Sequence, residues 1–256
     1  MEKISRVKTP LPVAGGAAEY QCGACRDTGW LVGPQGASPC ACRQERLLAF
    51  RRRRAGLTDA MLRQTFDAFD LKYYQEYLQV EQGISYRALA HKAKNACQKF
   101  TRDIIAKRET RSLLLEGGVG RGKSFLAAAC ANELVNNGIE TLFLAVPEFL
   151  DEIRAGYQKS GEFSEGELTG RACGVPVLIL DDLGAHNFSD WTKNKIFTII
   201  NHRVNHSLPC VITTNLNIEE MKDAVGERTV SRILELCDIC PLKSETDIRL
   251  IIHNRR

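Results

Sequence analysis

The sequence lacks any apolar run long enough to cross a bilayer, which takes about 20 residues. Its longest apolar runs are the short segments 113–115 and 177–180. The first ten residues lack the apolar stretch of a secretory signal peptide, and the chain has no internal repeat or low-complexity block. These absences argue against a membrane-spanning, secreted or fibrous protein. We therefore expect a cytoplasmic protein without a membrane partner.

The sequence also lacks a strong net charge, at +4, but its charges are unevenly distributed. Residues 1–111 contain 20 basic and 11 acidic residues, whereas residues 112–256 contain 15 and 20. The basic residues concentrate at 51–54 and between 87 and 111. This asymmetry is compatible with a nucleic-acid contact or an acidic protein partner, and equally with solvated helix faces.

From Ser112 onward, short apolar runs alternate with amphipathic helical stretches. This alternation predicts an α/β fold with a mostly parallel sheet covered by helices on both faces. Predicted strands cover residues 112–115, 141–145, 177–180 and 210–213. Predicted helices cover residues 43–54, 58–63, 85–107, 123–136, 147–157, 190–205, 218–224 and 226–236. Thr58 is a candidate N-cap, and residues 160–170 are predicted to form a polar loop.

Residues 117–124 match the phosphate-loop pattern G-x-x-x-x-G-K-[ST] between a predicted strand and a predicted helix. Its glycines allow successive backbone N–H groups to turn toward phosphates, and the helix N-terminus favours anions. We expect Lys123 to reach the β- and γ-phosphates of ATP and Ser124 to bind Mg²⁺. A glycine-rich turn with a chance Lys-Ser pair is the alternative. The expected nucleotide contacts are Gly117, Gly118, Val119, Gly120, Arg121, Gly122, Lys123, Ser124 and Phe125.

Acidic residues end the apolar run at 177–180. Asp181 occupies the place of a magnesium-binding acid, and Asp182 that of a carboxylate that polarises the attacking water. Asn215 follows the last predicted strand and is a candidate hydrogen-bond partner of the γ-phosphate or the water. The alternatives are a helix N-cap or solvated turn for the acids, and an Asx-turn for Asn215.

Four of the ten cysteines lie within 22–42, in the order Cys22-x-x-Cys25 and Cys40-x-Cys42. Two such pairs form a closed, structural Cys₄ site, for which we expect Zn²⁺. An iron–sulfur cluster and free or redox-active thiols are the alternatives. The Cys237-x-x-Cys240 pair lies in an apolar stretch and is interpreted as packing, and no histidine is assigned to a metal.

Together these motifs resemble an AAA+ ATPase, and more narrowly the DnaC/DnaI/IstB-like group of helicase loaders and transposition helpers. The supporting strings are FTIIN at 197–201, LPCVITTNL at 208–216 and ERTVSR at 227–232, and the resemblance covers roughly 55–252. It implies that Asn215 is the sensor 1 residue, that Arg232 is an arginine finger for a neighbouring subunit, and that Arg249 is the sensor 2 arginine. A surface ion pair is the alternative for both arginines.

The resemblance also implies partners. A finger that acts on a neighbouring subunit implies self-association, and ATP-bound loaders of this group grip single-stranded DNA through a segment that corresponds to 147–171. Arg154, Tyr157 and Lys159 are weak candidates for that contact, whereas Phe149, Leu150 and Ile153 fit core packing. In DnaI-like proteins a similar cysteine-rich module docks on the replicative DnaB-type helicase.

The expected organisation is a zinc-binding module at 1–54, a linker at 55–84 and an AAA+ domain at 85–256. The main functional hypothesis is an ATP-dependent loader of the replicative helicase onto single-stranded DNA, with weak, switch-like hydrolysis. The second is an IstB-like ATPase helper of a transposase on duplex DNA. The third is an adaptor that binds nucleotide without hydrolysing it.

Overall fold

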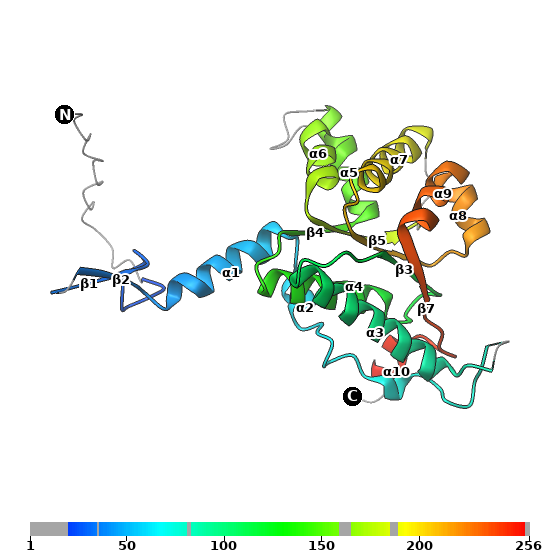
Figure 1. Ribbon diagram of the computed structural model, residues 1–256, viewed down its shortest axis with the longest axis horizontal. Coiled ribbons are helices and arrows are strands. Elements are labelled where there is room, and N and C mark those ends of the chain that lie inside the picture. Colours follow the sequence, from blue (N-terminus) through cyan, green and yellow to red (C-terminus); the bar gives the residue numbers. More distant parts are fainter. Residues whose placement is uncertain (1–19, 35, 81–82, 159–164, 185–188, 254–256) are drawn as a thin grey trace. The chain divides into compact units, whose positions relative to one another are not determined.

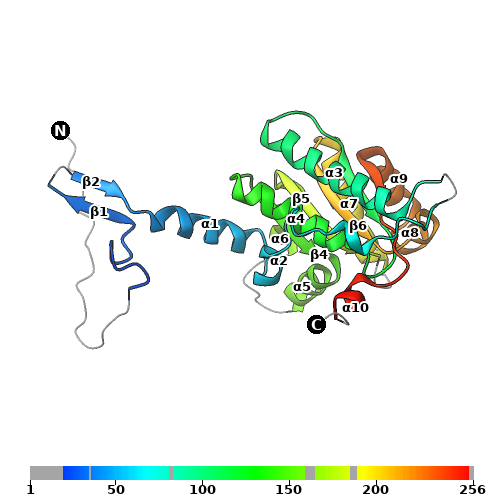
Figure 2. The same cartoon turned by 90° about the horizontal axis from the view of Figure 1, so that it is seen from below.

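The computed structural model describes residues 20–34, 36–80, 83–158, 165–184 and 189–253 (Figures 1 and 2). Their contacts divide the chain into two compact units, Met1–Leu47 and Leu48–Arg256. Helix α1 (Cys42–Arg54) begins in the first and ends in the second. Each unit is described by itself.

The first unit is organised around its cysteines. Strands β1 (Trp30–Gly33) and β2 (Gly36–Pro39) form an antiparallel hairpin whose side chains are all exposed. Among the described residues of this unit, the buried positions are Cys25, Gly29 and Cys40. A module this small cannot bury enough apolar surface to fold by that means alone, so its interior is the cysteine cluster itself.

The second unit is built on a parallel five-stranded sheet in the order β4-β5-β6-β3-β7. The strands are β3 (Ser112–Glu116), β4 (Thr141–Ala145), β5 (Val177–Leu183), β6 (Cys210–Thr214) and β7 (Cys237–Pro241). Because all five run in the same direction, their carboxyl ends lie along one edge. The phosphate loop and Asn215 follow β3 and β6 at that edge, and the two aspartates lie near the carboxyl end of β5.

Helices cover both faces of the sheet, as predicted (Figure 1). One buried cluster packs beneath α2 (Asp59–Leu62), α3 (Tyr86–Ile105) and α4 (Lys123–Asn136). The other packs beneath α5 (Val146–Gln158), α6 (Glu165–Gly174), α7 (Asp190–Asn205), α8 (Ile218–Val225) and α9 (Glu227–Leu236). The remaining helical elements are the 3₁₀ turn η1 (Leu71–Tyr73) and α10 (Ile248–His253). None of the described helices combines the length and apolarity that crossing a membrane requires.

The segment 55–84 was expected to form a linker, but several of its described residues contribute to the core of the second unit. Phe66, Phe69 and Tyr74 are buried in the cluster that also holds α3 and α4. Ala55 is 1% exposed, and its carbonyl oxygen accepts a hydrogen bond from Phe143 N at the edge strand β4. This segment therefore lines the core of the second unit rather than spacing two domains.

The four predicted strands are confirmed, and Thr58 caps α2 as predicted, because its side chain accepts a hydrogen bond from Met61 N. The predicted loop at 160–170 is wrong from Glu165 onward, where α6 begins; residues 159–164 lie outside the described part of the chain. Strand β7 was not predicted. Cys237 and Cys240 lie on it and are both buried, which agrees with their interpretation as packing residues.

Candidate functional site

The phosphate loop connects the buried strand β3 to α4. Three of its glycines, Gly117, Gly120 and Gly122, have positive φ angles of 152°, 69° and 86°, a conformation that only glycine adopts without strain. Neighbouring groups also leave no room for a side chain at these positions. A Cβ on Gly117 would lie 2.1 Å from the carbonyl oxygen of Leu242, and one on Gly122 would lie 2.6 Å from the hydroxyl of Tyr74.

The other loop residues have distinct environments. Val119 is 59% exposed, whereas the ring of Phe125 on α4 packs with its centroid 5.7 Å from that of Phe69. The guanidinium of Arg121 donates to the Ser244 hydroxyl at 2.5 Å, and the backbone carbonyl of Arg121 accepts from the Tyr74 hydroxyl at 2.8 Å. The segments that carry Tyr74 and Ser244 therefore both hold the loop in place.

The side chain of Lys123 connects the phosphate loop to Asn215, the residue that follows strand β6. Its ammonium group donates to the carbonyl oxygen of Gly118 at 2.8 Å and to Asn215 Oδ1 at 2.6 Å. The amide of Asn215 in turn donates to Asp182 Oδ1 at 2.6 Å. A continuous chain of hydrogen bonds thus joins three residues that are 92 and 33 positions apart in sequence.

The two aspartates reach the same site because strand β5 is irregular. Consecutive side chains of a strand normally point to opposite faces. The pairing of β5 with β6 shifts register between Leu180 and Leu183, and Asp182 has a φ of 62°. Asp181 Oδ1 accepts a hydrogen bond from the Thr213 hydroxyl at 2.6 Å, and the same hydroxyl oxygen accepts from Asp182 N at 2.9 Å.

Thr213 was given no role from the sequence, yet it contacts both aspartates. A threonine at the end of an apolar strand is common, so no local signal distinguishes it from a packing residue. Only the pairing of β5 with β6 brings its hydroxyl between the two aspartates.

Burial dominates the electrostatics of this site. It lowers the pKa of Lys123 to about 8; the carboxylates of Asp182 and Asp181 oppose that change, and the cations Arg121 and Arg249 add to it. Burial also raises the pKa of Asp181, although hydrogen bonds from Thr213 and Ser124 act in the opposite direction. The hydroxyl of Ser124 therefore lies close to the carboxylate of Asp181, and both carry oxygen atoms of the kind that Mg²⁺ binds.

The two predicted arginines lie on different elements. Arg232 on α9 is paired with Glu235 one turn along the same helix, at 2.8 Å between Nη1 and Oε2. Arg249 pairs with Asp247 close to the phosphate loop. The surface ion pair considered for both residues is present, while their expected roles toward nucleotide stay predictions.

The segment expected to contact DNA is only partly described. Phe149, Leu150 and Ile153 are buried in the core, which supports the packing interpretation. Arg154 donates from Nη2 to the Thr192 hydroxyl at 3.2 Å. The side chain of Tyr157 and the whole of Lys159 lie outside the described part of the chain.

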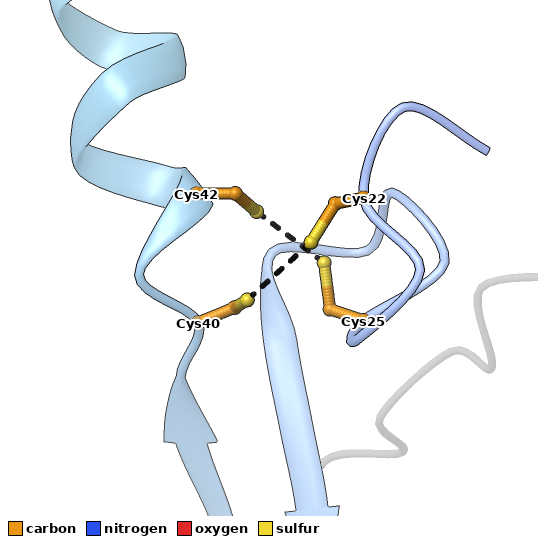
Figure 3. Close-up of side chains that lie close together, drawn as sticks. All are labelled: Cys22, Cys25, Cys40 and Cys42. Carbon is orange, nitrogen blue, oxygen red and sulfur yellow. Dashed lines mark hydrogen bonds between the residues drawn. The ribbon is translucent and has the colours of Figure 1, made fainter.

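The four N-terminal cysteines converge, as predicted. Their sulfur atoms all lie within 4.8 Å of one another (Figure 3). Cys22 Sγ lies 3.8 Å from Cys40 Sγ, and Cys25 Sγ lies 3.4 Å from Cys42 Sγ. Zinc–sulfur bonds of ~2.3 Å in a tetrahedron separate sulfur atoms by roughly 3.8 Å. The residues therefore fit a structural zinc ion.

Backbone and side-chain groups around the cysteines support their arrangement. Gly29 N lies 3.4 Å from Cys25 Sγ and donates to it. The carboxylate of Asp27 accepts hydrogen bonds from the backbone N–H groups of Gln21 and Cys22 and from the guanidinium of Arg46 on α1. Burial raises the pKa of the Cys25 thiol, but hydrogen bonds from Cys42 and Gly29 outweigh it and lower that pKa to about 6. The same hydrogen bond raises the pKa of Cys42, so these contacts favour the thiolate form at Cys25.

Comparison with known proteins agrees with this geometry. The family model of the IstB-like ATP binding proteins matches residues 51–250. The replicative helicase loader DnaI of Bacillus subtilis (strain 168) is 33% identical over 113 residues, which are 44% of this chain and 35% of the relative. The replicative helicase loader DnaC of Escherichia coli (strain K12) is 33% identical over 122 residues, 48% of this chain and 49% of the relative. The chain thus spans half or less of the length of these curated relatives.

Solved structures agree in fold. A crystal structure of DnaI aligns with a TM-score of 0.56 at 23% identity, covering 75% of this chain and 94% of that one. A crystal structure of the DnaC helicase loader aligns with a TM-score of 0.59 at 22% identity, covering 73% and 100%. With its phosphate loop, strand-end aspartates and parallel sheet, the chain belongs to the IstB-like ATP binding protein family, within the DnaC/DnaI/IstB-like group of AAA+ ATPases.

Proposed function

We propose that this protein is an ATP-dependent loader that delivers a replicative DnaB-type helicase onto single-stranded DNA in the cytoplasm. The observation that carries the proposal is the convergence of Lys123, Asn215 and the two aspartates beside the phosphate loop, in a chain whose curated relatives are helicase loaders. A nucleotide site and a metal-binding module in one chain fit a protein that responds to ATP and holds a partner.

Each residue of the site has a role in this proposal. Lys123 would exchange its bonds to Gly118 and Asn215 for the β- and γ-phosphates, because an ammonium group binds phosphate oxygens more strongly than neutral carbonyls. Ser124 and Asp181 would hold Mg²⁺ with the nucleotide. One N–H of the Asn215 amide would still donate to Asp182, which would orient the attacking water, and the second N–H would donate to the γ-phosphate.

Hydrolysis in this scheme is a weak, switch-like step. Lys123 and Asn215 already bind one another, so ATP must compete with an internal hydrogen bond before it occupies the site. Arg232 would complete the site of a neighbouring subunit, since a guanidinium supplied in trans stabilises the charge of phosphoryl transfer. The side chain of Arg232 on α9 is 39% exposed, which is compatible with such a contact.

The N-terminal unit would hold the helicase. Its four cysteines would bind a structural zinc ion, which substitutes for the core that so short a segment lacks. The hairpin then presents Trp30 and Val32, which are 43% and 85% exposed, to a partner. Exposed aromatic and apolar side chains on a rigid support are typical of protein-binding surfaces.

The proposal is tested by co-elution with the host's replicative helicase on a sizing column, with ATP or ADP. We expect a complex with the full chain, none with a Cys40→Ser variant, and loss of its nucleotide dependence in Lys123→Ala. Lys92→Ala, which removes an exposed lysine of α3, is the matched control. No complex with either nucleotide would refute the loader.

A second function is favoured by the matching family model, which describes IstB-like ATP binding proteins. An ATPase helper of a transposase would share the same nucleotide site but would bind duplex DNA. If the full chain assembles on duplex DNA with ATP and ignores the helicase, this function replaces the first. If the chain binds nucleotide but shows no ATP turnover that depends on Lys123, as tested with Lys123→Ala, it is an adaptor instead.

A further inference from the structure

The carboxylate of Asp247 lies against the phosphate loop. The next residue, Ile248, donates its backbone N–H to the carbonyl oxygen of Gly120 at 3.0 Å. A Cβ on Gly120 would lie 1.9 Å from Asp247 Oδ1, so the absence of a side chain at Gly120 leaves the room that this carboxylate fills. Neither the phosphate-loop pattern nor the family resemblance accounts for an acid at this point.

The same carboxylate binds Arg249 through both backbone and side chain. Asp247 Oδ1 accepts from Arg249 N at 2.8 Å and from Nε at 3.1 Å, and Asp247 Oδ2 accepts from Nη2 at 2.8 Å. The pair is bidentate along one edge of the guanidinium. Nη1, at the opposite end of the fork, makes none of these bonds and retains its two N–H donors.

The segment that carries this pair is itself fixed. Arg121 of the phosphate loop donates from Nη1 to the Ser244 hydroxyl at 2.5 Å and to the Thr246 carbonyl oxygen at 3.1 Å. Glu245 N donates to Gln75 Oε1 at 3.0 Å. Asp247 therefore has a defined place relative to the loop, with its side chain 24% exposed, whereas the side chain of Arg249 is 69% exposed. An arginine this exposed needs a partner to limit its rotamers.

We propose that Asp247 is a positioning residue for Arg249. By holding the Nε and Nη2 edge, it aims the free Nη1 of Arg249 at the terminal phosphate of ATP in the phosphate loop. This inference rests on the proposed binding of ATP and deepens it, because it names a residue that favours ATP over ADP without touching either. The carboxylate of Asp247 can lie so near an anion site because Arg249 neutralises it.

The test is the affinity of the full chain for fluorescent ATP and ADP analogues with Mg²⁺. Asp247→Asn keeps an oxygen acceptor for the backbone N–H of Arg249 but loses the charge that holds the guanidinium. We expect its affinity for ATP to fall about tenfold, or ~1.4 kcal/mol, with affinity for ADP within about twofold of wild type. Glu245→Gln is the matched control, because it makes the same charge change two residues away.

A double variant separates positioning from other roles. If Asp247 acts through Arg249, then Asp247→Asn has no further effect on ATP affinity in an Arg249→Ala background. Equal losses for ATP and ADP, an Asp247→Asn variant that matches Glu245→Gln, or tighter ATP binding by Asp247→Asn would each overturn the inference. A wild-type chain that binds neither nucleotide would instead refute the proposed function.

Discussion

Replacement of Arg203 by methionine is expected to destabilise the ATPase unit strongly. Arg203 on α7 is completely buried, at 0% exposure. Its guanidinium donates to five backbone carbonyl oxygens at 2.7–3.3 Å, those of Ala172, Cys173, Val175, Pro176 and Pro209. Most of them belong to or follow the C-terminal turn of α6, whose last carbonyls have no partner within the helix. The buried guanidinium of Arg203 thus caps the C-terminus of α6.

The magnitude follows from the acceptors that would be left without a donor. An unsatisfied buried acceptor costs about 1–3 kcal/mol, but Pro209 O also accepts from Leu178 N. Methionine fills similar space and removes a buried charge whose pKa burial lowers, which offsets part of the loss. We therefore expect a net loss of ~3–5 kcal/mol, out of a total stability of about 5–15 kcal/mol.

Thermal and urea unfolding of the full chain measure this loss. At roughly 2–4 °C per kcal/mol for a domain of this size, the melting temperature should fall by about 6–20 °C. Arg203→Lys retains the charge but has fewer N–H donors, so its melting temperature should lie between those of Arg203→Met and wild type. Arg102→Met, at an exposed position on α3, is the control and should stay within about 0.5 kcal/mol of wild type. If Arg203→Met also stayed within about 0.5 kcal/mol of wild type, the carbonyl oxygens would not depend on the guanidinium, and the reasoning would be refuted.

Three further predictions concern the sites. Because Asp182 has a φ of 62°, Asp182→Ala should be less stable than Asp182→Gly by about 1 kcal/mol in urea unfolding, while both lose ATP turnover; equal stability would remove the inferred strain. Thr213→Val should lower ATP turnover at saturating Mg²⁺, since it removes the hydroxyl that binds the Asp181 carboxylate and the backbone N–H of Asp182; unchanged turnover would leave Thr213 a packing role. Asp27→Asn should release zinc to a chromogenic chelator about tenfold faster than wild type, whereas zinc release at the wild-type rate would mean that Asp27 does not support the cluster.

Features that depend on adjacent residues were predictable from the sequence. The phosphate loop is a contiguous pattern, so its position between a strand and a helix followed directly from the glycines and the flanking apolar run. The cluster of four cysteines was predictable for the same reason, because two closely spaced pairs supply four sulfur atoms. The predicted strands are nearly continuous apolar runs, as strands buried on both faces are.

Elements without a local pattern were missed. Strand β7 has only five residues, includes Asp238 and Pro241, and directly follows a helix, so neither length nor alternation distinguishes it. Helix α6 contains three glycines and has polar residues in its first half, which resembles a loop. Both are stabilised by what they pack against, β3 in one case and α5 and α7 in the other.

The sequence by itself determined which residues form the phosphate loop, the acids at a strand end and the cysteine cluster, because those residue types occur at short, fixed spacings. Only the tertiary structure decided how they meet. The bulge at Asp182 brings two consecutive carboxylates to one site, the pairing of β5 with β6 places Thr213 between them, and Asp247 reaches Gly120 from more than a hundred residues away. Such contacts join segments that are far apart in the sequence, so no local sequence pattern predicts them. The free energy that stabilises them comes from packing rather than from local propensity.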